Sequence, residues 1–92
     1  MLLELQPSAT AADRAAILEA LATLPDRIPT VRNYVAAADA GLAEGNADIC
    51  AIGDFDDVAG YEAYRDHEAH RQVIADHIAP VLAGRTAIQV EI

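Results

Sequence analysis

The sequence predicts one α+β domain in which four short strands and two helical regions follow the order β-α-β-β-α-β. Four apolar segments have the length and composition of strands, and two longer segments repeat apolar residues at helical spacing. The whole chain, residues 1–92, has the size of a single domain. This order is that of the split β-α-β motif, whose sheet is antiparallel.

The first half of the chain contains a strand, a helix and a second strand. Residues 1–6 are apolar and are followed by a proline, so they are predicted to form a strand. Thr10 begins a sequence that resembles a capping box, and leucines and isoleucines then recur at helical spacing over residues 11–24. Pro25 is expected to end this helix. Residues 31–38 are predicted to form the second strand.

The second half begins with a glycine-containing loop and contains two further strands. Residues 48–55 (DICAIGDF) form the central predicted strand, and an aspartate after it is expected to cap a short helix that carries two tyrosines. The segment 66–70 (DHEAH) interrupts this helix, and a further helix is predicted from about residue 69 to a stop at Gly84. Residues 86–92 alternate apolar and polar side chains and are predicted to form the last strand.

The central strand is apolar on both faces. Ile49, Ala51 and Phe55 point one way, while Cys50 and Ile52 point the other. Helices cover only one face of such a sheet, and leaving the other face wet would forfeit several kcal/mol at about 25 cal/mol per Å². That loss is comparable to the net stability of a small domain. We therefore expect a homodimer in which a second sheet covers this face.

Composition excludes several kinds of partner. The formal net charge is −9, and the six basic residues are scattered arginines, so neither nucleic acid nor an anionic membrane is an expected partner. No apolar run approaches the roughly 20 residues that span a bilayer. The N-terminus lacks the basic region of a signal peptide, and the single cysteine, Cys50, suits a reducing compartment. A cytoplasmic location is expected.

Two long segments carry a resemblance to a known family. AEGNADICAIGDFDD and the following YEAYRDHEAHRQVIADHIAPVLAGR resemble the stress-responsive dimeric α+β barrel (Dabb) domain, as does the earlier TLPDRIPTVRNY. That family commonly shows E-G-x-x-D, a strand ending in F-x-D or F-x-S, and then Y-x-x-H-P-x-H before a helix. The resemblance implies a ferredoxin-like protomer whose sheet packs on that of a second copy, helices outside, to form a dimeric α+β barrel.

This chain departs from the family pattern at two points. Glu68 stands where many members have proline between the two histidines. A histidine that is often found in the family's first strand has no counterpart here, which removes one polar group from the expected barrel interior.

The segment YRDHEAH provides the candidate catalytic residues. Histidine titrates near neutral pH, which suits a general acid or base, and a tyrosine can donate a hydrogen bond to a developing oxyanion. The family includes plant stress proteins and a plant polyketide cyclase that closes an aromatic ring by aldol condensation. By resemblance to that cyclase, Tyr64 and His70 are the functional pair, with His70 removing a proton beside a carbonyl and Tyr64 orienting the substrate. His67 and Tyr61 are expected to contact the ligand.

Each of these residues also has a purely structural interpretation. His67 lies at a helix boundary, where a capping role is common, and His70 shares a helical face with Ile74. Tyr64 and Tyr61 are equally consistent with core or interface positions. Sequence alone leaves these alternatives open.

No cofactor is expected, and no metal site is expected within one chain, while a metal site shared across a dimer stays an open alternative at this point. His77 follows His70 by two helical turns, roughly 10 Å at 1.5 Å per residue, which is too far for one ion. His67 and His70 lie closer together, but zinc sites require three or four well-placed ligands. Cys50 has apolar neighbours and no nearby cation, as inert packing cysteines do.

Three functions are consistent with these observations. The first is a small barrel enzyme that cyclises, isomerises or decarboxylates a hydrophobic carbonyl compound, with His70 as general base. The second is a non-catalytic, stress-related or ligand-binding homodimer. The third is a cofactor-free monooxygenase, which shares the dimeric barrel in other families but has no specific support here. A cavity of ligand size beside His70 would favour the first function, and a solidly filled interior would favour the second.

Overall fold

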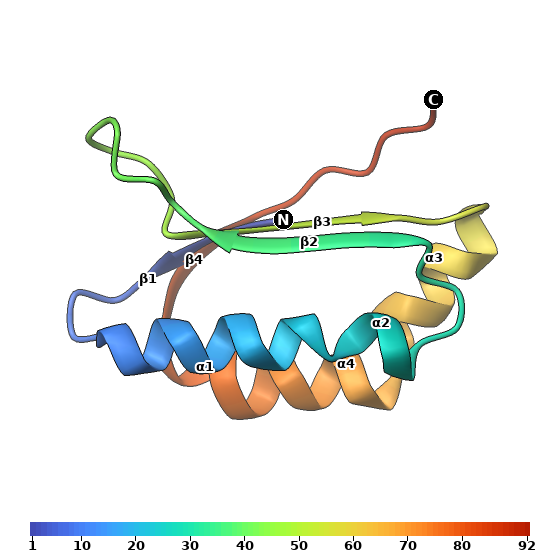
Figure 1. The fold of residues 1–92 in the computed structure, drawn as a ribbon, viewed down its shortest axis with the longest axis horizontal. Helices are drawn as coiled ribbons and strands as arrows, with labels where there is room; N and C mark the ends of the chain where they lie inside the picture. The colour runs from blue at the N-terminus through green and yellow to red at the C-terminus, as the bar shows by residue number, and fades with distance from the viewer.

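The computed structural model describes residues 1–92 as two layers, an antiparallel sheet and a set of helices that covers one of its faces (Figure 1). In chain order the elements are β1 (Leu2–Leu5), α1 (Ala11–Ala22), α2 (Leu24–Arg27), β2 (Asn33–Ala38), β3 (Ile49–Asp54), α3 (Val58–Asp66), α4 (Glu68–Val73), a π-helical turn (Ile74–Ile78), a 3₁₀ turn (Ala79–Val81) and β4 (Leu82–Thr86). The strands lie in the order β2-β3-β1-β4, and every neighbouring pair is antiparallel. This is the ferredoxin-like arrangement that was predicted.

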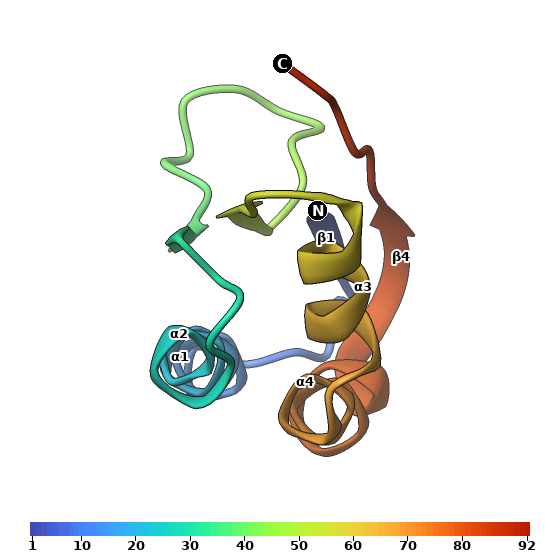
Figure 2. The same ribbon diagram turned by 90° about the vertical axis from the view of Figure 1, so that its right-hand side faces the viewer.

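The helices are arranged in one layer beneath the sheet. Figure 2 shows α1 and α4 side by side, with α3 raised toward the sheet at the end of the molecule that faces the viewer. The predicted capping box is present at the start of α1, where the Thr10 hydroxyl accepts from the Asp13 amide and the Asp13 carboxylate accepts from the Thr10 amide. Pro25 does not end the helical region as predicted, because it lies in the first turn of α2, where a missing N–H costs little.

The hydrophobic core lies between the two layers and is built from one face of each strand. Leu3 and Leu5 of β1 and Ile49 and Ala51 of β3 point toward the helices and are buried. The largest fully buried side chains are Leu3, Ile17, Leu21, Leu24, Ile28, Ile49 and Ile78. The apolar face of α1 that the sequence predicted is therefore the face that is buried.

The last strand is not where the sequence predicted it. β4 runs over Leu82–Thr86, whereas residues 87–92, most of the predicted strand, lie outside the sheet. Gly84 was predicted to end a helix, but it pairs with Glu4 inside β4. The reason is strand pairing: β4 is hydrogen-bonded to β1 only as far as the pair of Leu2 and Thr86, so no neighbouring strand extends beyond that point.

The outer face of the sheet is apolar and uncovered in a single chain. Val35 and Ile52, which are cross-strand partners on β2 and β3, are each 57% exposed, and Leu2 of β1 is also exposed. The segment 87–92 leaves the sheet on this same side, away from the helices (Figure 1), and its apolar residues are exposed as well. The two-faced character that was read from residues 49–55 is present in the fold.

None of the helices combines the length and the apolar character that crossing a bilayer requires.

The core predicts a clear difference between a buried and an exposed aliphatic side chain. We expect Ile17→Ala, which truncates a fully buried side chain, to lower the free energy of unfolding by about 2–5 kcal/mol. Leu42→Ala, at a position that is 90% exposed in the β2–β3 loop, should change it by no more than about 0.5 kcal/mol. Urea unfolding followed by circular dichroism measures both, and equal effects would contradict the core assignment.

Candidate functional site

A cavity of about 400 Å³ lies at one end of the molecule, between β3, α3, β4 and the segment 87–92. That volume falls within the range of small-molecule sites, which is about 300–1,000 Å³. Its 17 lining residues include 11 hydrophobic ones. The cavity thus has the general character of a ligand site, an apolar wall with a few polar groups.

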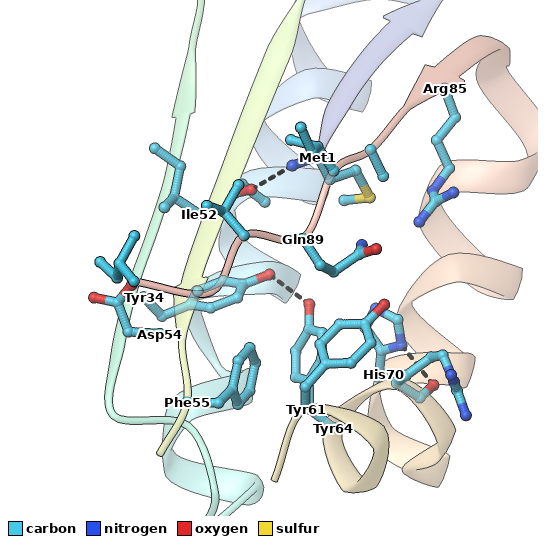
Figure 3. Close-up of a pocket in the computed structure, with 17 residues that line it drawn as sticks. Met1, Tyr34, Ile52, Asp54, Phe55, Tyr61, Tyr64, His70, Arg85 and Gln89 are labelled. Carbon is cyan, nitrogen blue, oxygen red and sulfur yellow. Dashed lines mark hydrogen bonds between the residues drawn. The ribbon is translucent and has the colours of Figure 1, made fainter. Parts of the chain in front are cut away.

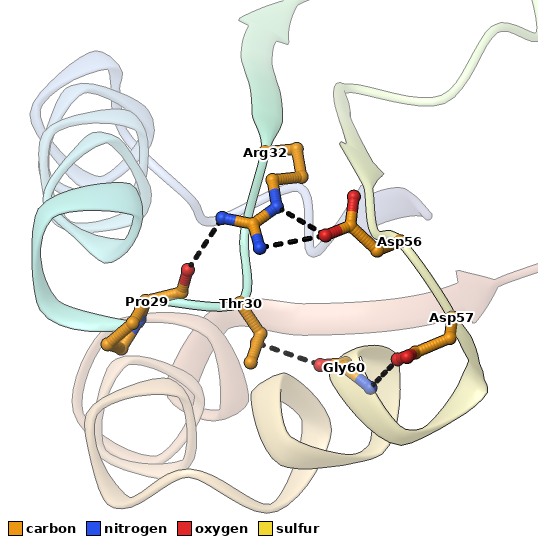
Figure 4. Close-up of polar contacts among 6 residues, drawn as sticks. All are labelled: Pro29, Thr30, Arg32, Asp56, Asp57 and Gly60. Carbon is orange, nitrogen blue, oxygen red and sulfur yellow. Dashed lines mark hydrogen bonds and ion pairs between the residues drawn. The ribbon is translucent and has the colours of Figure 1, made fainter.

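The start of α3, which brings two tyrosines to the cavity, is fixed by a set of polar contacts (Figure 4). Asp57 is the N-cap, and its carboxylate accepts a 2.7 Å hydrogen bond from the Gly60 amide. The Thr30 hydroxyl donates to the Gly60 carbonyl oxygen at 2.8 Å. Arg32 pairs with Asp56 at 2.8 Å, and the guanidinium lowers the pKa of that carboxyl. These contacts join the segment before β2 to α3 and so orient α3 against the sheet.

Every phenylalanine and tyrosine of the chain lines this one cavity. The sequence has three tyrosines and one phenylalanine, and Tyr34, Phe55, Tyr61 and Tyr64 all belong to its wall. Neighbouring ring centroids are 5.1 Å apart for Phe55 and Tyr64 and 5.7 Å apart for Phe55 and Tyr61. These separations are typical of interacting aromatic pairs. We refer to the space that these four rings and His70 enclose as the aromatic cavity.

Two tyrosine hydroxyls meet inside the aromatic cavity. The oxygens of Tyr34 and Tyr64 are 3.1 Å apart and share a hydrogen bond (Figure 3), although the residues lie on β2 and α3. Burial raises the pKa of Tyr34 above its ordinary value of 10.0, and burial together with the Tyr34 hydroxyl raises that of Tyr64. Both groups therefore stay protonated at neutral pH. Because one O–H is used within the pair, the other is free to donate to a ligand oxygen.

The His70 ring packs against the Tyr64 ring at a tilt of 41°. The ring centroids are 4.4 Å apart, and the two residues are only 8% and 9% exposed. The Nδ1 atom of His70 lies 3.1 Å from the backbone oxygen of Arg65 (Figure 3), and a carbonyl oxygen can only accept. The neutral ring therefore carries its proton on Nδ1, which leaves the lone pair on Nε2.

The Nε2 atom of His70 is available to a ligand. The structure contains no fully buried side-chain nitrogen or oxygen without a hydrogen-bond partner, so Nε2, which has no partner, retains access to the cavity. Burial lowers the pKa of His70 below its ordinary value of 6.5, and the positive charge of Arg85 adds to that effect, while the Arg65 carbonyl opposes it. At neutral pH the side chain is therefore an uncharged proton acceptor.

The structure brings three of the four predicted site residues together. Tyr64, His70 and Tyr61 line the cavity, and the guanidinium carbon of Arg65 lies 5.9 Å from the Tyr61 ring centroid. His67 is not part of the wall. It is the N-cap of α4, where its Nδ1 atom accepts from the Ala69 amide at 3.0 Å.

Sequence reasoning missed Tyr34, Phe55 and Arg85 as members of the site. The composition contained a usable signal. The chain has only four phenylalanine and tyrosine residues among many aliphatic ones, and so few large rings could have been examined as members of one site. Strand alternation also places Tyr34 on the helix-facing side of β2, opposite Gly53. Arg85 had no such signal, since it was read as part of a connection between a helix and a later strand.

No group of three or more histidine, cysteine, aspartate or glutamate side chains is arranged to hold a metal ion. Cys50 is a free thiol on the outer face of β3 and does not line the aromatic cavity.

Comparisons with known proteins identify relatives of the whole chain. The sequence profile of the stress responsive A/B barrel domain (Dabb) matches residues 1–92. A dimeric ferredoxin-like protein of unknown function from Thermobifida fusca is 40% identical, with a TM-score of 0.90 over 99% of this chain and 85% of that one.

More distant structures share the fold. A dimeric ferredoxin-like protein of unknown function from Bacteroides fragilis is 19% identical, with a TM-score of 0.86 over 99% of this chain and 90% of that one. A Dabb family protein from Mesorhizobium loti is 17% identical, with a TM-score of 0.72 over 90% and 82% of the two chains. No curated protein sequence matches the chain.

The environment of His70 predicts how stability depends on pH. The pKa of His70 is lower in the folded protein than its ordinary value of 6.5, which applies to the unfolded chain. The unfolded chain therefore binds the proton more readily, and protonation favours the unfolded state. Above pH 7 this group contributes nothing, and the loss of stability grows as pH falls below about 6.5. We expect the melting temperature of wild type to fall more steeply than that of His70→Asn between pH 7.5 and 5.5.

Nuclear magnetic resonance titration of the His70 ring checks the same point directly. A midpoint below 6.5, with Nδ1 protonated in the neutral form, is expected. A midpoint at or above 6.5 would contradict the buried, uncharged state of this histidine.

Proposed function

This chain belongs to the stress-responsive A/B barrel domain (Dabb) family, and from that membership and the aromatic cavity we propose that it binds and transforms a small apolar carbonyl compound. The reaction class is proton abstraction from a carbon beside a carbonyl group, with His70 as the general base. Cyclisation and isomerisation both begin with such a step. The single observation that carries the proposal is the gathering of all four aromatic residues and His70 around one cavity.

The proposed mechanism uses groups that are already oriented. The Nε2 lone pair of His70 takes the proton from the carbon, and the electrons of that C–H bond move onto the carbonyl oxygen to give an enolate. One hydroxyl of the Tyr34–Tyr64 pair donates a hydrogen bond to this oxygen, while the other donates within the pair, and this stabilises the charge as it develops. When the carbonyl is conjugated with a double bond, His70 returns the proton to a different carbon of the extended enolate, which moves the double bond. In a cyclisation the enolate carbon instead attacks a second carbonyl carbon of the same molecule, and the oxygen of that second carbonyl takes the proton from His70.

The geometry supports this assignment in two ways. His70 is held by the Arg65 carbonyl, so its basic nitrogen does not have to be ordered when the ligand binds. The tyrosine pair is held by its mutual hydrogen bond and by contacts between the rings. Most of the wall is apolar, and polar interactions with a ligand are stronger in such surroundings than in open water.

A non-catalytic ligand-binding protein is the alternative. The same cavity could hold an apolar compound by stacking and by one tyrosine hydrogen bond without any proton transfer. The relatives at 40% and 19% identity are of unknown function, so they do not distinguish the two possibilities. The two possibilities differ in whether the protein accelerates proton exchange of a bound ketone or only binds it.

The protein is also proposed to act as a homodimer. Two similar structures are dimeric, and the outer face of this sheet exposes Val35, Ile52 and Leu2 without any cover in a single chain. A second sheet that packs face to face would remove this apolar surface from water. The segment 87–92 projects on the same side and would lie near the second copy (Figure 1).

Hydrogen–deuterium exchange at carbon tests the proposed chemistry. In D₂O, we expect wild type to accelerate exchange of the protons beside the carbonyl of 4-phenyl-2-butanone. The loss of these proton signals is measured by nuclear magnetic resonance. His70→Asn retains a donor for the Arg65 carbonyl but lacks Nε2, and it should reduce the enzymatic rate by about 10²–10⁴-fold. Tyr64→Phe should reduce it by a smaller factor, because the Tyr34 hydroxyl remains.

The matched control is His77→Asn, which changes an exposed histidine outside the cavity and should leave the rate unchanged. Binding is followed in the same samples by the shifts of the tyrosine ring signals. A ketone that shifts these signals without exchanging faster than in buffer would favour the non-catalytic alternative. An exchange rate that survives in His70→Asn would overturn the role of this histidine.

Light scattering tests the dimer. Wild type is expected to scatter with twice the mass of the 9.7 kDa chain at micromolar concentration. Val35→Asp places a charge on the outer face and should shift the protein toward a single chain, whereas Leu42→Asp, at an exposed loop position, should not. A monomeric wild type would contradict the proposed assembly.

A further inference from the structure

We propose that the ligand of the aromatic cavity carries a carboxylate and that Arg85 is the residue that binds it. This inference rests on the proposed function, because it names the class of ligand that the cavity takes. The ligand would be an apolar carbonyl compound with a carboxylate at the end away from the tyrosine pair.

The fold directs Arg85 toward the cavity rather than toward the outer face. Arg85 lies on β4 opposite Leu3, whose side chain is fully buried beneath the helix-facing side of the sheet. Paired residues on neighbouring strands project to the same face, so the Arg85 side chain also leaves the sheet on that side. Figure 3 shows the guanidinium descending from β4 into the cavity, on the side where His70 lies. Arg85 itself remains exposed, which places its charge at the mouth of the cavity.

Arg85 has no carboxylate partner within the chain. The ion pairs of the structure involve Arg32, which binds Asp56, and Arg65, which binds Glu62 and Asp66. Arg65 also lines the cavity, but its charge is already paired. Four of the six arginines form no ion pair, and Arg85 is the one of these four that lines the cavity. Its planar guanidinium is suited to binding a carboxylate through two parallel hydrogen bonds.

The charges around the cavity favour one position for an anion. Asp54 is an acidic residue of the wall, and Figure 3 places it on the opposite side from Arg85. The net charge of −9 repels anions at long range, but charges farther away than about 8 Å are largely screened at physiological salt. Arg85 therefore dominates the potential at its end of the cavity.

The polar groups near Arg85 favour one orientation of the ligand in the cavity. Arg85 is close enough for its positive charge to oppose the rise in the pKa of Tyr64 that burial causes, and to add to the fall in the pKa of His70 that burial causes. A ligand that binds Arg85 through a carboxylate can thus place its carbonyl oxygen near the hydroxyls of Tyr64 and Tyr34, with the intervening carbon beside Nε2 of His70. Arg85 would then determine specificity, while His70 and Tyr64 act on the reacting atoms.

A pair of compounds that differ only in charge tests the inference. The probes are 4-oxo-4-phenylbutanoate and its uncharged amide, 4-oxo-4-phenylbutanamide, titrated into the full chain and followed by the nuclear magnetic resonance signals of His70 and Tyr64. We expect wild type to bind the carboxylate more tightly than the amide. Arg85→Gln should weaken carboxylate binding by about tenfold or more, as loss of a charged hydrogen bond does, and leave amide binding unchanged.

Two further variants separate charge from structure. Arg85→Lys keeps the positive charge and should retain most of the preference for the carboxylate. Arg71→Gln makes the same change in net charge at an exposed arginine outside the cavity and should bind both compounds as wild type does.

The outcomes distinguish this inference from the function on which it rests. If both compounds bind wild type with equal affinity, or if Arg85→Gln leaves the carboxylate affinity unchanged, the role of Arg85 is overturned and the cavity remains a ligand site. If neither compound shifts the His70 and Tyr64 signals, ligand binding in the cavity fails, and the Arg85 inference fails with it.

Discussion

The pairing of β1 with both β3 and β4 is the constraint on which the rest of the structure depends. β1 has only four residues, yet it lies inside the sheet and supplies Leu3 to the centre of the core. β4 remains in the sheet only where β1 is beside it, and past Thr86 the chain leaves the sheet on the side away from the helices (Figure 1). The aromatic cavity is lined by β3, by this C-terminal segment and by α3. Core formation and site formation are therefore consequences of the same strand.

The site combines a low-polarity wall with a few groups whose protonation is fixed by burial. Desolvation keeps Tyr34 and Tyr64 protonated and His70 uncharged at neutral pH. The cavity wall thus holds hydrogen-bond donors and an acceptor that are all uncharged at neutral pH. This is an economical arrangement for chemistry at a carbonyl group, because the donors suit its oxygen and the acceptor suits the adjacent C–H group.

The fold of this chain is shared with known structures, whereas the proposed chemistry depends on its own side chains. Structures that are 40%, 19% and 17% identical to this chain share its ferredoxin-like protomer. At 19% and 17% identity the likeness concerns the fold alone. The same architecture carries many functions, so the proposed reaction depends on the side chains of this cavity and not on the fold. Tyr34, Tyr64, His70 and Arg85 come from four different elements, and their meeting is what makes the proposal specific to this chain.

The sequence by itself determined the element order, the burial of one face of α1, the apolar character of both faces of β3 and the Y-x-x-H-x-x-H segment. These are local properties, because spacing along the chain sets which residues share a face of a helix or strand. Only the tertiary structure decided that β4 begins at Leu82, that His67 caps α4 while His70 enters the cavity, and that Tyr34 meets Tyr64. Those outcomes depend on strand register and on how α3 lies against the sheet, which are contacts between residues 30 or more positions apart. No local pattern encodes such contacts.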